Sequence, residues 1–288
     1  MRILVTGANG QVGRSMLDLD GQDGHEIIGL NRQQFDLREP EGFDRIVDKI
    51  EPDAIVNAAA YTAVDKAEDE PELVQLINAV APGMMASVAA KNRLPFIHIS
   101  TDYVFDGTKV EPYDETDTVN PINMYGQTKL AGEVLVRANH SASLILRTSS
   151  VFSAYGNNFL KKISSSIDKG RKLRVIDDQF GSPTFAKEIA VNIIGFLEKP
   201  LQGIDILNIA GPESITWYSF AEMIAQQKKI NHAELSISLE RCLAKDYSTR
   251  ANRPRHSTLS INLLKKLTKY KSYPLNQSIA DCIKKYED

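Results

Sequence analysis

The sequence predicts an α/β fold in which helices cover both faces of a parallel sheet. Short apolar runs alternate with longer helical patterns through residues 1–148, and the first run leads directly into a glycine-rich turn. Of the 288 residues, 42% are hydrophobic and 25% are charged, as in ordinary globular proteins. These proportions exclude a disordered or collagen-like chain, and the length is ample for a hydrophobic core.

The apolar runs have the length of buried strands, and the stretches between them place apolar residues at helical spacing. We expect strands at residues 3–5, 25–30, 54–56, 95–100 and 143–146, and helices at residues 11–19, 43–50, 71–91 and 125–139. Strands that alternate with helices form βαβ units. Their right-handed crossovers place helices on both faces of a parallel sheet.

Beyond Thr148 the alternation becomes less regular, which predicts a second, smaller lobe. We expect strands at residues 173–176 and 205–209, helices at 186–198 and 219–228, and a helical, Lys-rich tail from Ile261. No internal repeat or Gly/Ser-rich linker separates the two parts of the sequence. We therefore assign residues 1–148, together with about 185–210, to the main domain, and residues 149–184 and 211–288 to an interleaved C-terminal lobe.

Charge and cysteine content narrow the classes of function. The 34 Lys and Arg residues against 37 Asp and Glu residues give a net charge of -3, so we expect no nucleic-acid polymer as a partner. The two cysteines, Cys242 and Cys282, have neither a CxxC nor a zinc spacing, and we expect reduced thiols. Since the sequence has no run of ~18 apolar residues, we expect no membrane partner and a cytoplasmic protein.

Gly7, Gly10 and Gly13 follow the first predicted strand and open the first predicted helix. Their G-x-x-G-x-x-G spacing, in the sequence GANGQVG, is the arrangement that a dinucleotide pyrophosphate needs at a helix N-terminus. Gly7 would permit the tight turn, Gly10 the close approach of the phosphates, and Gly13 the packing of the helix on the sheet. The main domain is therefore expected to be an NAD(P)-binding domain with a Rossmann-type, doubly wound parallel sheet.

The end of the second predicted strand bears on the choice of cofactor. NAD-selective domains often carry Asp or Glu there to bind the ribose 2′-hydroxyl, whereas this chain has Asn31 and Arg32. Arg32 would attract a 2′-phosphate, which predicts NADPH; a solvated surface arginine is the alternative. Asn31 could still hydrogen-bond a free ribose hydroxyl, so NADH is also expected to be usable. Asp36 and Leu37 would border the adenine.

Tyr125 and Lys129 lie one turn apart on the same face of a predicted helix. A phenol with a pKa near ~10 is a poor acid–base catalyst at neutral pH, and a neighbouring lysine ammonium would lower that pKa. Thr101 follows a predicted strand, so its hydroxyl is expected at the carboxyl edge of the sheet, where open α/β sheets bind ligands. A hydroxyl that holds a carbonyl, a phenol that protonates it and a lysine that tunes the phenol together predict carbonyl reduction.

Several longer stretches resemble the extended short-chain dehydrogenase/reductase superfamily and, within it, the dTDP-4-dehydrorhamnose reductases. They are GANGQVG from Gly7, NAAAYTAVDKAE from Asn57, STDYVFDG from Ser100, YGQTKLAGE from Tyr125, LRTS from Leu146, GNNF from Gly156 and DDQFGSPT from Asp177. The stretches follow the order of the family over almost the whole chain. Together they are far more specific than any one of them.

The resemblance implies a catalytic set of Thr101, Tyr125 and Lys129. With the ribose-side residues above, the cofactor set is Gly7, Gly10, Gln11, Val12, Gly13, Asn31, Arg32, Asp36, Leu37, Ala58, Ala59, Ala60, Tyr61, Tyr125 and Lys129. The set expected to face the substrate is Val64, Asp65, Lys66, Thr101, Asp102, Tyr103 and Arg253. For Asp65 and Lys66, an ordinary surface ion pair is the alternative.

The implied activity is the NADPH-dependent reduction of the C4 ketone of dTDP-4-dehydro-6-deoxy-L-mannose to dTDP-L-rhamnose, with this dTDP-sugar as the partner molecule. Tyr125 would deliver the proton, Lys129 would lower the phenol pKa and hold the nicotinamide ribose, and Thr101 would bind the developing alkoxide. Arg253 or Arg255 would hold the diphosphate. Some relatives bind Mg²⁺ at a dimer interface, so Mg²⁺ and a homodimer stay open, although no compact carboxylate cluster identifies metal ligands.

Two departures from the family pattern keep other functions open. Residues 147–152 read RTSSVF where relatives usually read RTSWVY, and residues 253–257 read RPRHS where relatives read R-P-x-N-S, with His256 in place of Asn. A sister reductase that forms the talose epimer therefore stays open. Tyr103 stands where dehydratases carry Glu, which disfavours a dehydratase. A non-catalytic NADP-binding subunit of the methionine adenosyltransferase beta type is a further alternative, disfavoured by the intact catalytic set.

Overall fold

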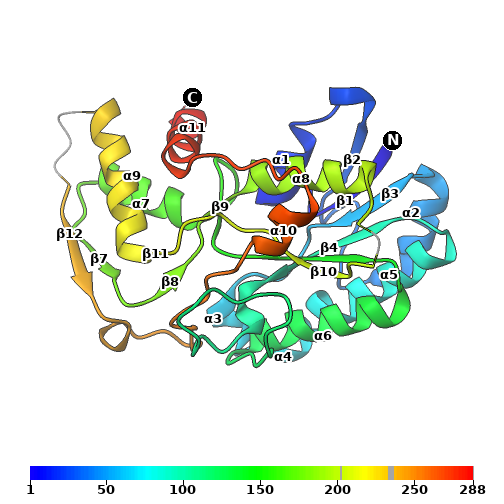
Figure 1. Cartoon of the computed structure of the whole chain (residues 1–288), viewed down its shortest axis with the longest axis horizontal. Coiled ribbons are helices and arrows are strands. Elements are labelled where there is room, and N and C mark those ends of the chain that lie inside the picture. Colours follow the sequence, from blue (N-terminus) through cyan, green and yellow to red (C-terminus); the bar gives the residue numbers. More distant parts are fainter. Residues whose placement is uncertain (202, 233–236, 288) are drawn as a thin grey trace.

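The computed structural model describes residues 1–201, 203–232 and 237–287 and is built around a six-stranded sheet (Figure 1). The strand order is β10-β5-β4-β3-β1-β2, and all neighbouring strands are parallel. The strands are β1 (Arg2–Thr6), β2 (Glu26–Leu30), β3 (Ala54–Asn57), β4 (Phe96–Thr101), β5 (Leu144–Thr148) and β10 (Ile206–Asn208). The predicted Rossmann-type α/β fold is confirmed.

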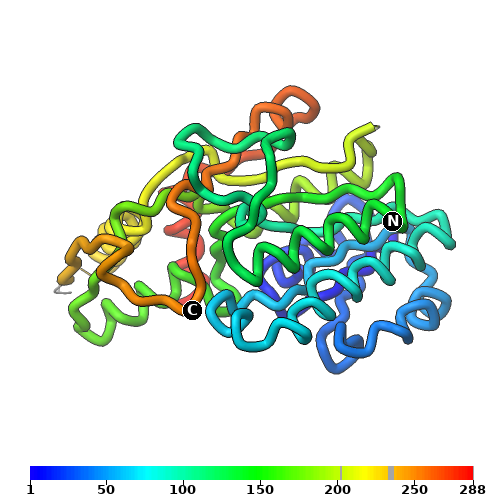
Figure 2. The backbone as a smooth tube through the Cα atoms, turned by 90° about the horizontal axis from the view of Figure 1, so that it is seen from below, coloured from blue at the N-terminus to red at the C-terminus, as the bar shows by residue number. Residues whose placement is uncertain are grey.

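Helices cover both faces of this sheet, as its alternating side chains require. On one face α1 (Gln11–Leu17) and α8 (Ala186–Glu198) share a core with Ile3 and Val5 of β1. On the other face α2 (Phe43–Ile50), α5 (Ala81–Lys91) and α6 (Met124–Asn139) share a core with Leu4. Because successive strand residues point to opposite faces, β1 contributes to both cores. Figure 2 shows α5 and α6 side by side along the sheet.

A further hydrophobic core lies in the C-terminal part of the chain. It joins α7 (Phe159–Asp168), α9 (Trp217–Asn231) and α11 (Leu275–Glu287). Small two-stranded sheets accompany these helices. They pair β6 (Val151–Phe152) with β9 (Thr184–Phe185), β8 (Phe180–Gly181) with β11 (Ile215–Thr216), and β7 (Leu173–Ile176) with β12 (Leu239–Cys242).

The chain passes repeatedly between the two parts. Helix α8 packs against α1, and β10 pairs with β5, so this segment lies in the main domain. Residues Leu259, Ile261 and Leu264, around α10 (Asn262–Leu267), also belong to the α1/α8 core. We propose that the chain forms a main domain and an interleaved lobe. In this division residues 259–264 belong to the lobe but pack on the main sheet.

Several elements differ from those expected. The helix expected at residues 71–91 consists of α4 (Pro71–Gln75), a π-helical segment η3 (Leu76–Val80) and α5, and the Lys-rich tail forms two helices, α10 and α11. Helix α7 and the two-residue strands were not expected, because such short apolar patterns are not distinctive. The short elements that complete the fold are α3 (Val64–Ala67), η1 (Gln22–Gly24), η2 (Pro40–Gly42), η4 (Asp102–Val104) and η5 (Ala244–Asp246).

The segment Pro71–Lys91 is long and apolar enough, by length and composition alone, to cross a membrane. It is not an uninterrupted apolar run, because it contains Glu72, Gln75 and Asn78. Moreover, 56% of the apolar window is buried, and Ile77 and Met85 pack in the core beside the sheet. The segment is a core helix of this fold. Cys242 and Cys282 are free and buried, as expected for reduced thiols.

Candidate functional site

A cavity of about 670 Å³ opens at the carboxyl ends of the central strands. Strands β2 and β3 flank β1 on opposite sides, so the connections after β1 and β3 diverge and leave a crevice where ligands of such sheets bind. Most of the residues expected from the sequence line this cavity. They are Gly7, Gly10, Gln11, Val12, Asn31, Arg32, Asp36, Leu37, Ala58, Ala59, Ala60, Thr101, Asp102, Tyr125 and Lys129.

The glycine-rich loop has the geometry of a phosphate-binding turn. Gly7 has a φ of +75°, in the left-handed region, as the tight turn requires. A Cβ on Gly13 would lie 2.2 Å from the Gly7 carbonyl oxygen, so only glycine lets α1 begin this close to β1. The first turn of α1 carries no acidic residue, and its free N–H groups suit an anion. The loop and the cavity therefore fit a nicotinamide dinucleotide.

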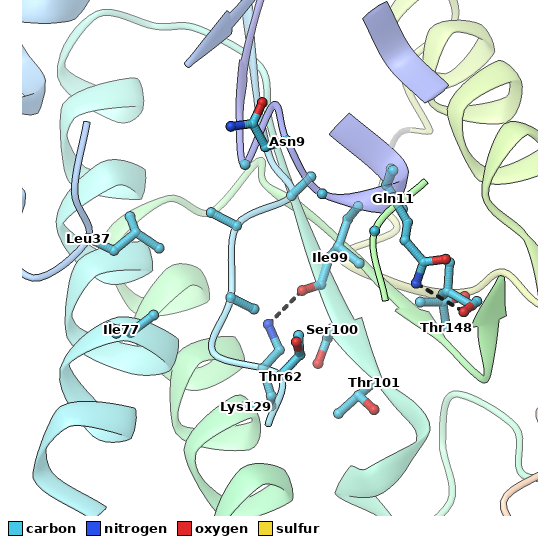
Figure 3. A pocket seen from close by; sticks show the side chains of 18 of the residues that line it. Asn9, Gln11, Leu37, Thr62, Ile77, Ile99, Ser100, Thr101, Lys129 and Thr148 are labelled. Carbon is cyan, nitrogen blue, oxygen red and sulfur yellow. Dashed lines mark hydrogen bonds between the residues drawn. The ribbon is translucent and has the colours of Figure 1, made fainter. Parts of the chain in front are cut away.

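Gln11 connects this loop to the C-terminal lobe. Its side-chain Nε2 donates to the Val151 carbonyl (3.1 Å), and its Oε1 accepts from the Ser153 hydroxyl (3.0 Å) and the Asn158 amide (2.9 Å). Figure 3 shows the Gln11 side chain directed toward the residues beyond β5. The segment 151–158 thus closes one side of the cavity.

Arg32 brings a positive charge to the ribose side of the cavity, where Asp36 is a neighbouring carboxylate. The Asn31 Oδ1 caps that turn by accepting from the Gln33 and Gln34 amides (2.9 and 3.2 Å). Asp36 pairs with Arg38 (2.5 Å), and this hydrogen bond lowers the pKa of Asp36. Because Arg38 neutralises Asp36, the charge of Arg32 at the cavity is only partly offset.

Thr101 and Tyr125 meet at the end of β4 and the start of α6. The Thr101 hydroxyl donates to Asp102 Oδ1 (3.0 Å) and accepts from the Tyr103 backbone amide (3.2 Å), and it lies close enough to the Tyr125 phenol to lower the pKa of that group. Burial raises the pKa of Tyr125 to about 12, against the lowering effect of Thr101. Burial also raises the pKa of Asp102 to about 6, although hydroxyl groups hydrogen-bond its carboxylate.

Lys129 lines the cavity, although only 1% of its surface is exposed. Its Nζ donates to the Ile99 carbonyl at 2.6 Å, as Figure 3 shows. The same Nζ lies 3.2 Å from His98 Nε2. Burial lowers its pKa to about 8. We expected Lys129 to lower the phenol pKa, but in the free protein the pKa of Tyr125 is raised. The physical reason is that the Lys129 amine is held by β4, while burial dominates at the phenol.

Tyr125 is held in place by close packing around the next residue. A Cβ on Gly126 would lie 2.1 Å from the Tyr103 carbonyl oxygen, so glycine is required for α6 to approach η4. The Tyr103 and Tyr125 rings meet edge to face, with centroids 5.8 Å apart. The glycine of the YGQTK stretch is thus explained by the position of the tyrosine beside it.

Arg253 does not have the free guanidinium that a diphosphate contact would need. It forms a bidentate ion pair with Asp65 (2.7 and 3.1 Å), and the neighbouring Tyr103 hydroxyl acts together with Asp65 to raise the pKa of Arg253 against the effect of burial. This pairing lowers the pKa of Asp65. The Asp65–Arg253 pair joins α3 to the C-terminal lobe beside Tyr103. Asp65 and Lys66 were expected to face the substrate, with an ordinary surface ion pair as the alternative. Lys66 is exposed on α3, next to the half-buried Val64.

Tyr61 differs from its expected orientation beside the cofactor. Its hydroxyl donates to Glu70 (2.6 Å), and its backbone exchanges hydrogen bonds with the Asn78 side chain. Among the described residues that line the cavity, the backbone stretch Ala58–Ala60 is present and Tyr61 is absent. The motif located the loop correctly but not the direction of its tyrosine.

The sequence reasoning missed Asn57 and His98, which lie behind the cavity wall. Both are 0% exposed and hydrogen-bond each other, and His98 contacts Lys129. A signal was available, because both are polar residues inside short apolar strands.

His256, at the departure from the family pattern, stacks on Phe180 with ring centroids 5.1 Å apart. Within residues 1–201, 203–232 and 237–287, no group of three or more His, Cys, Asp or Glu side chains could hold a metal, so Mg²⁺ gains no support.

Comparisons with known proteins agree with the resemblance. The whole chain, residues 1–288, matches the family described as RmlD substrate binding domain. It is 38% identical over 281 residues to a dTDP-4-dehydrorhamnose reductase of Burkholderia thailandensis, covering 92% of each chain. A solved dTDP-4-dehydrorhamnose reductase of Clostridium acetobutylicum matches with a TM-score of 0.92 and 31% identity over 100% of both chains. One from Bacillus anthracis, in complex with NADP, matches with a TM-score of 0.89 and 30% identity over 98% of each chain.

Proposed function

The chain belongs to the RmlD substrate-binding-domain family, with the dTDP-4-dehydrorhamnose reductases among its relatives, and from this membership we propose its reaction. The protein is a sugar-nucleotide oxidoreductase that reduces the C4 ketone of dTDP-4-dehydro-6-deoxy-L-mannose to dTDP-L-rhamnose. The observation that carries the proposal is the meeting of Thr101 and Tyr125 at the edge of a cavity whose other end is a glycine-rich phosphate loop.

When bound, the dihydronicotinamide supplies a hydride to C4 of the sugar. The Tyr125 phenol donates its proton to the oxygen of that carbon, and the raised pKa of the phenol ensures that it is protonated at neutral pH. The Thr101 hydroxyl holds the same oxygen while negative charge develops on it. Lys129, as an ammonium, hydrogen-bonds the nicotinamide ribose and stabilises the phenolate that remains.

The phosphate loop, Asn31 and Arg32 support NADPH as the preferred cofactor. The loop offers backbone N–H groups to the pyrophosphate, and Arg32 offers a guanidinium to a 2′-phosphate. The NADP in the Bacillus anthracis relative agrees with this choice. NADH lacks the 2′-phosphate, so it forgoes the Arg32 contact but keeps the others.

The substrate side is formed by Asp102, Tyr103 and the Asp65–Arg253 pair. Tyr103 contacts Tyr125 through its ring and Arg253 through its hydroxyl, so the sugar would lie against this group. Because Asp65 already neutralises Arg253, we propose Arg253 as an orienting residue and leave the diphosphate contact to Arg255. We place the protein in the cytoplasm, where nucleotide sugars are handled by soluble enzymes.

The proposal is tested by sugar-dependent oxidation of the cofactor. Purified protein is mixed with enzymatically prepared dTDP-4-dehydro-6-deoxy-L-mannose, and nicotinamide absorbance is followed with NADPH and, separately, with NADH. We expect turnover with both cofactors and a higher kcat/KM with NADPH. No sugar-dependent oxidation with either cofactor would refute the proposed activity and favour a non-catalytic NADP-binding protein.

A further inference from the structure

A chain of buried polar side chains runs behind the cavity, from β1 through β3 and β4 to α6. It consists of Thr6, Asn57, His98 and Lys129, each with at most 1% of its surface exposed. Of these four, only Lys129 belongs to the described lining of the cavity. The proposed reaction uses Lys129 and gives the other three no role.

The orientation of the Asn57 amide is fixed by two donors. Its Oδ1 accepts from the Ala59 backbone N–H (3.1 Å) and from the Thr6 hydroxyl (2.7 Å). A backbone N–H can only donate, so the oxygen must be the atom that faces Ala59. The amide nitrogen, Nδ2, is therefore the atom that lies 3.0 Å from His98 Nδ1.

This orientation decides which nitrogen of His98 carries the proton. An amide nitrogen donates and does not accept, so His98 Nδ1 must be the acceptor and is unprotonated. Burial holds the pKa of His98 well below its usual value, so the ring is neutral. Its single proton is then on Nε2, which lies 3.2 Å from the Lys129 amine.

His98 thus presents an N–H, not a lone pair, to Lys129. An ammonium has three donors and no acceptor, so it cannot accept this N–H. A neutral amine can accept it and still donate to the Ile99 carbonyl at 2.6 Å. We propose that His98, oriented by Asn57, is a positioning residue that destabilises the ammonium of Lys129, so that Lys129 releases its proton at a lower pH than it would without His98.

The other ionisable groups around Lys129 do not reverse this preference. Glu133, on the same helix, favours the ammonium, but its carboxylate is already paired with Arg147 (2.7 Å). Tyr125, one turn away, is neutral because burial raises its pKa to about 12. Asp102 also lines the cavity. Burial raises its pKa to about 6, and its carboxylate already accepts hydrogen bonds from the Thr101 and Ser149 hydroxyls. Burial has the largest effect on Lys129 and lowers its pKa, which is the direction that we propose for His98.

The inference deepens the proposed function, because Lys129 belongs to the proposed catalytic set, but its main test needs neither sugar nor cofactor. Nitrogen-15 NMR of the histidine rings in the free full-length protein reports the tautomer of His98, assigned by comparison with His98→Gln. We expect Nε2 to carry the proton and Nδ1 to be unprotonated. A ring protonated on Nδ1 overturns the proposal, and this measurement needs no variant to be active.

The second readout is the pKa of Lys129, followed through the ε-carbon signal of labelled lysine and assigned with Lys129→Met. In His98→Gln the side chain adds no charge and can turn an amide oxygen toward the ammonium, so the pKa of Lys129 should rise by about one unit or more. The matched control is Thr6→Val, which removes one donor to Asn57 but leaves the Ala59 N–H in place. It should leave the Lys129 pKa at the wild-type value.

An unchanged Lys129 pKa in His98→Gln, or an equal rise in Thr6→Val, overturns the role of His98. Activity then separates this inference from the proposed function. If both are correct, the alkaline limb of the kcat/KM profile moves to higher pH in His98→Gln together with the Lys129 signal. A Lys129 signal that moves while the alkaline limb stays fixed supports the His98 inference and refutes the catalytic role of Lys129.

Discussion

Replacement of Tyr125 by phenylalanine removes the proposed proton donor and keeps the ring. Burial raises the pKa of Tyr125 to about 12, so at pH 7 only about one phenol in 10⁵ is ionised and essentially every site holds the proton. A positioned general acid contributes typically ~10²- to 10⁴-fold. We therefore expect Tyr125→Phe to lower kcat by ~10²-fold or more, equivalent to about 2.7 kcal/mol or more in the activation barrier.

Cofactor binding should be nearly unchanged in this variant. The phenylalanine ring can keep the edge-to-face contact with Tyr103 at 5.8 Å, and the phosphate loop lies at the other end of the cavity. The assay is steady-state kcat under conditions where chemistry limits turnover, together with the NADPH dissociation constant from titration. Tyr103→Phe is the matched control, since it loses only a hydroxyl beside Arg253 and should raise KM more than it lowers kcat. A near-wild-type kcat in Tyr125→Phe would refute its role as the acid.

Three further predictions concern cofactor choice and stability. Arg32→Ala should weaken NADPH by about 10- to 150-fold, the equivalent of roughly 1.5–3 kcal/mol for a charge-assisted contact, and leave NADH nearly unchanged; an unchanged ratio of kcat/KM values would contradict this. Lys129 has a folded pKa of about 8 against 10.5 unfolded, so the unfolded chain binds the extra proton between these values. The unfolding free energy of the wild type, relative to that of Lys129→Met, should therefore rise by about 3 kcal/mol between about pH 8 and 10.5. Denaturant unfolding of both proteins at both pH values measures it, and a difference that does not change with pH would contradict the prediction. Arg147 and Glu133 form a buried ion pair, with 3% and 2% of their side chains exposed. Arg147→Met leaves the Glu133 carboxylate buried without its partner and should lower the unfolding free energy by about 3–5 kcal/mol. A loss under about 1 kcal/mol would show that the pair does not stabilise the fold.

Local pattern predicted the parts of the site whose geometry is itself local. Gly7 and Gly13 lie in one short turn between a strand and a helix, and their spacing alone specifies the turn. Tyr125 and Lys129 share a face because they are one helical turn apart. Thr101 could be located because parallel strands all end at one edge of the sheet.

Long-range pairing could not be predicted in the same way. Asp65 and Arg253 are 188 positions apart, and Lys129 and His98 are 31 apart, so no periodicity connects them. The motif around Tyr61 specified a backbone path, whereas the direction of its side chain depends on Glu70. The pKa of Tyr125 was expected to be lowered by its neighbour on the helix, but the fold directs that neighbour to β4 and buries the phenol.

The same limits apply to the fold. The main sheet follows from regular alternation, which βαβ units impose along the chain. In the C-terminal lobe, two-residue strands such as Phe180–Gly181 form only because partners distant in sequence meet them. Helix α7 did carry a pattern, since Leu160, Ile163 and Ile167 share one buried face behind the Asn158 cap. Its three consecutive serines weaken that pattern.

The central claim is reduction at C4 to the rhamno configuration, and the configuration of the product tests it most directly. Wild-type protein is incubated with dTDP-4-dehydro-6-deoxy-L-mannose and NADPH, and the proton couplings at C4 of the purified product are assigned by NMR. Our account predicts dTDP-L-rhamnose as the single product. A product with the talo configuration at C4, or recovery of unreduced ketone, would contradict it.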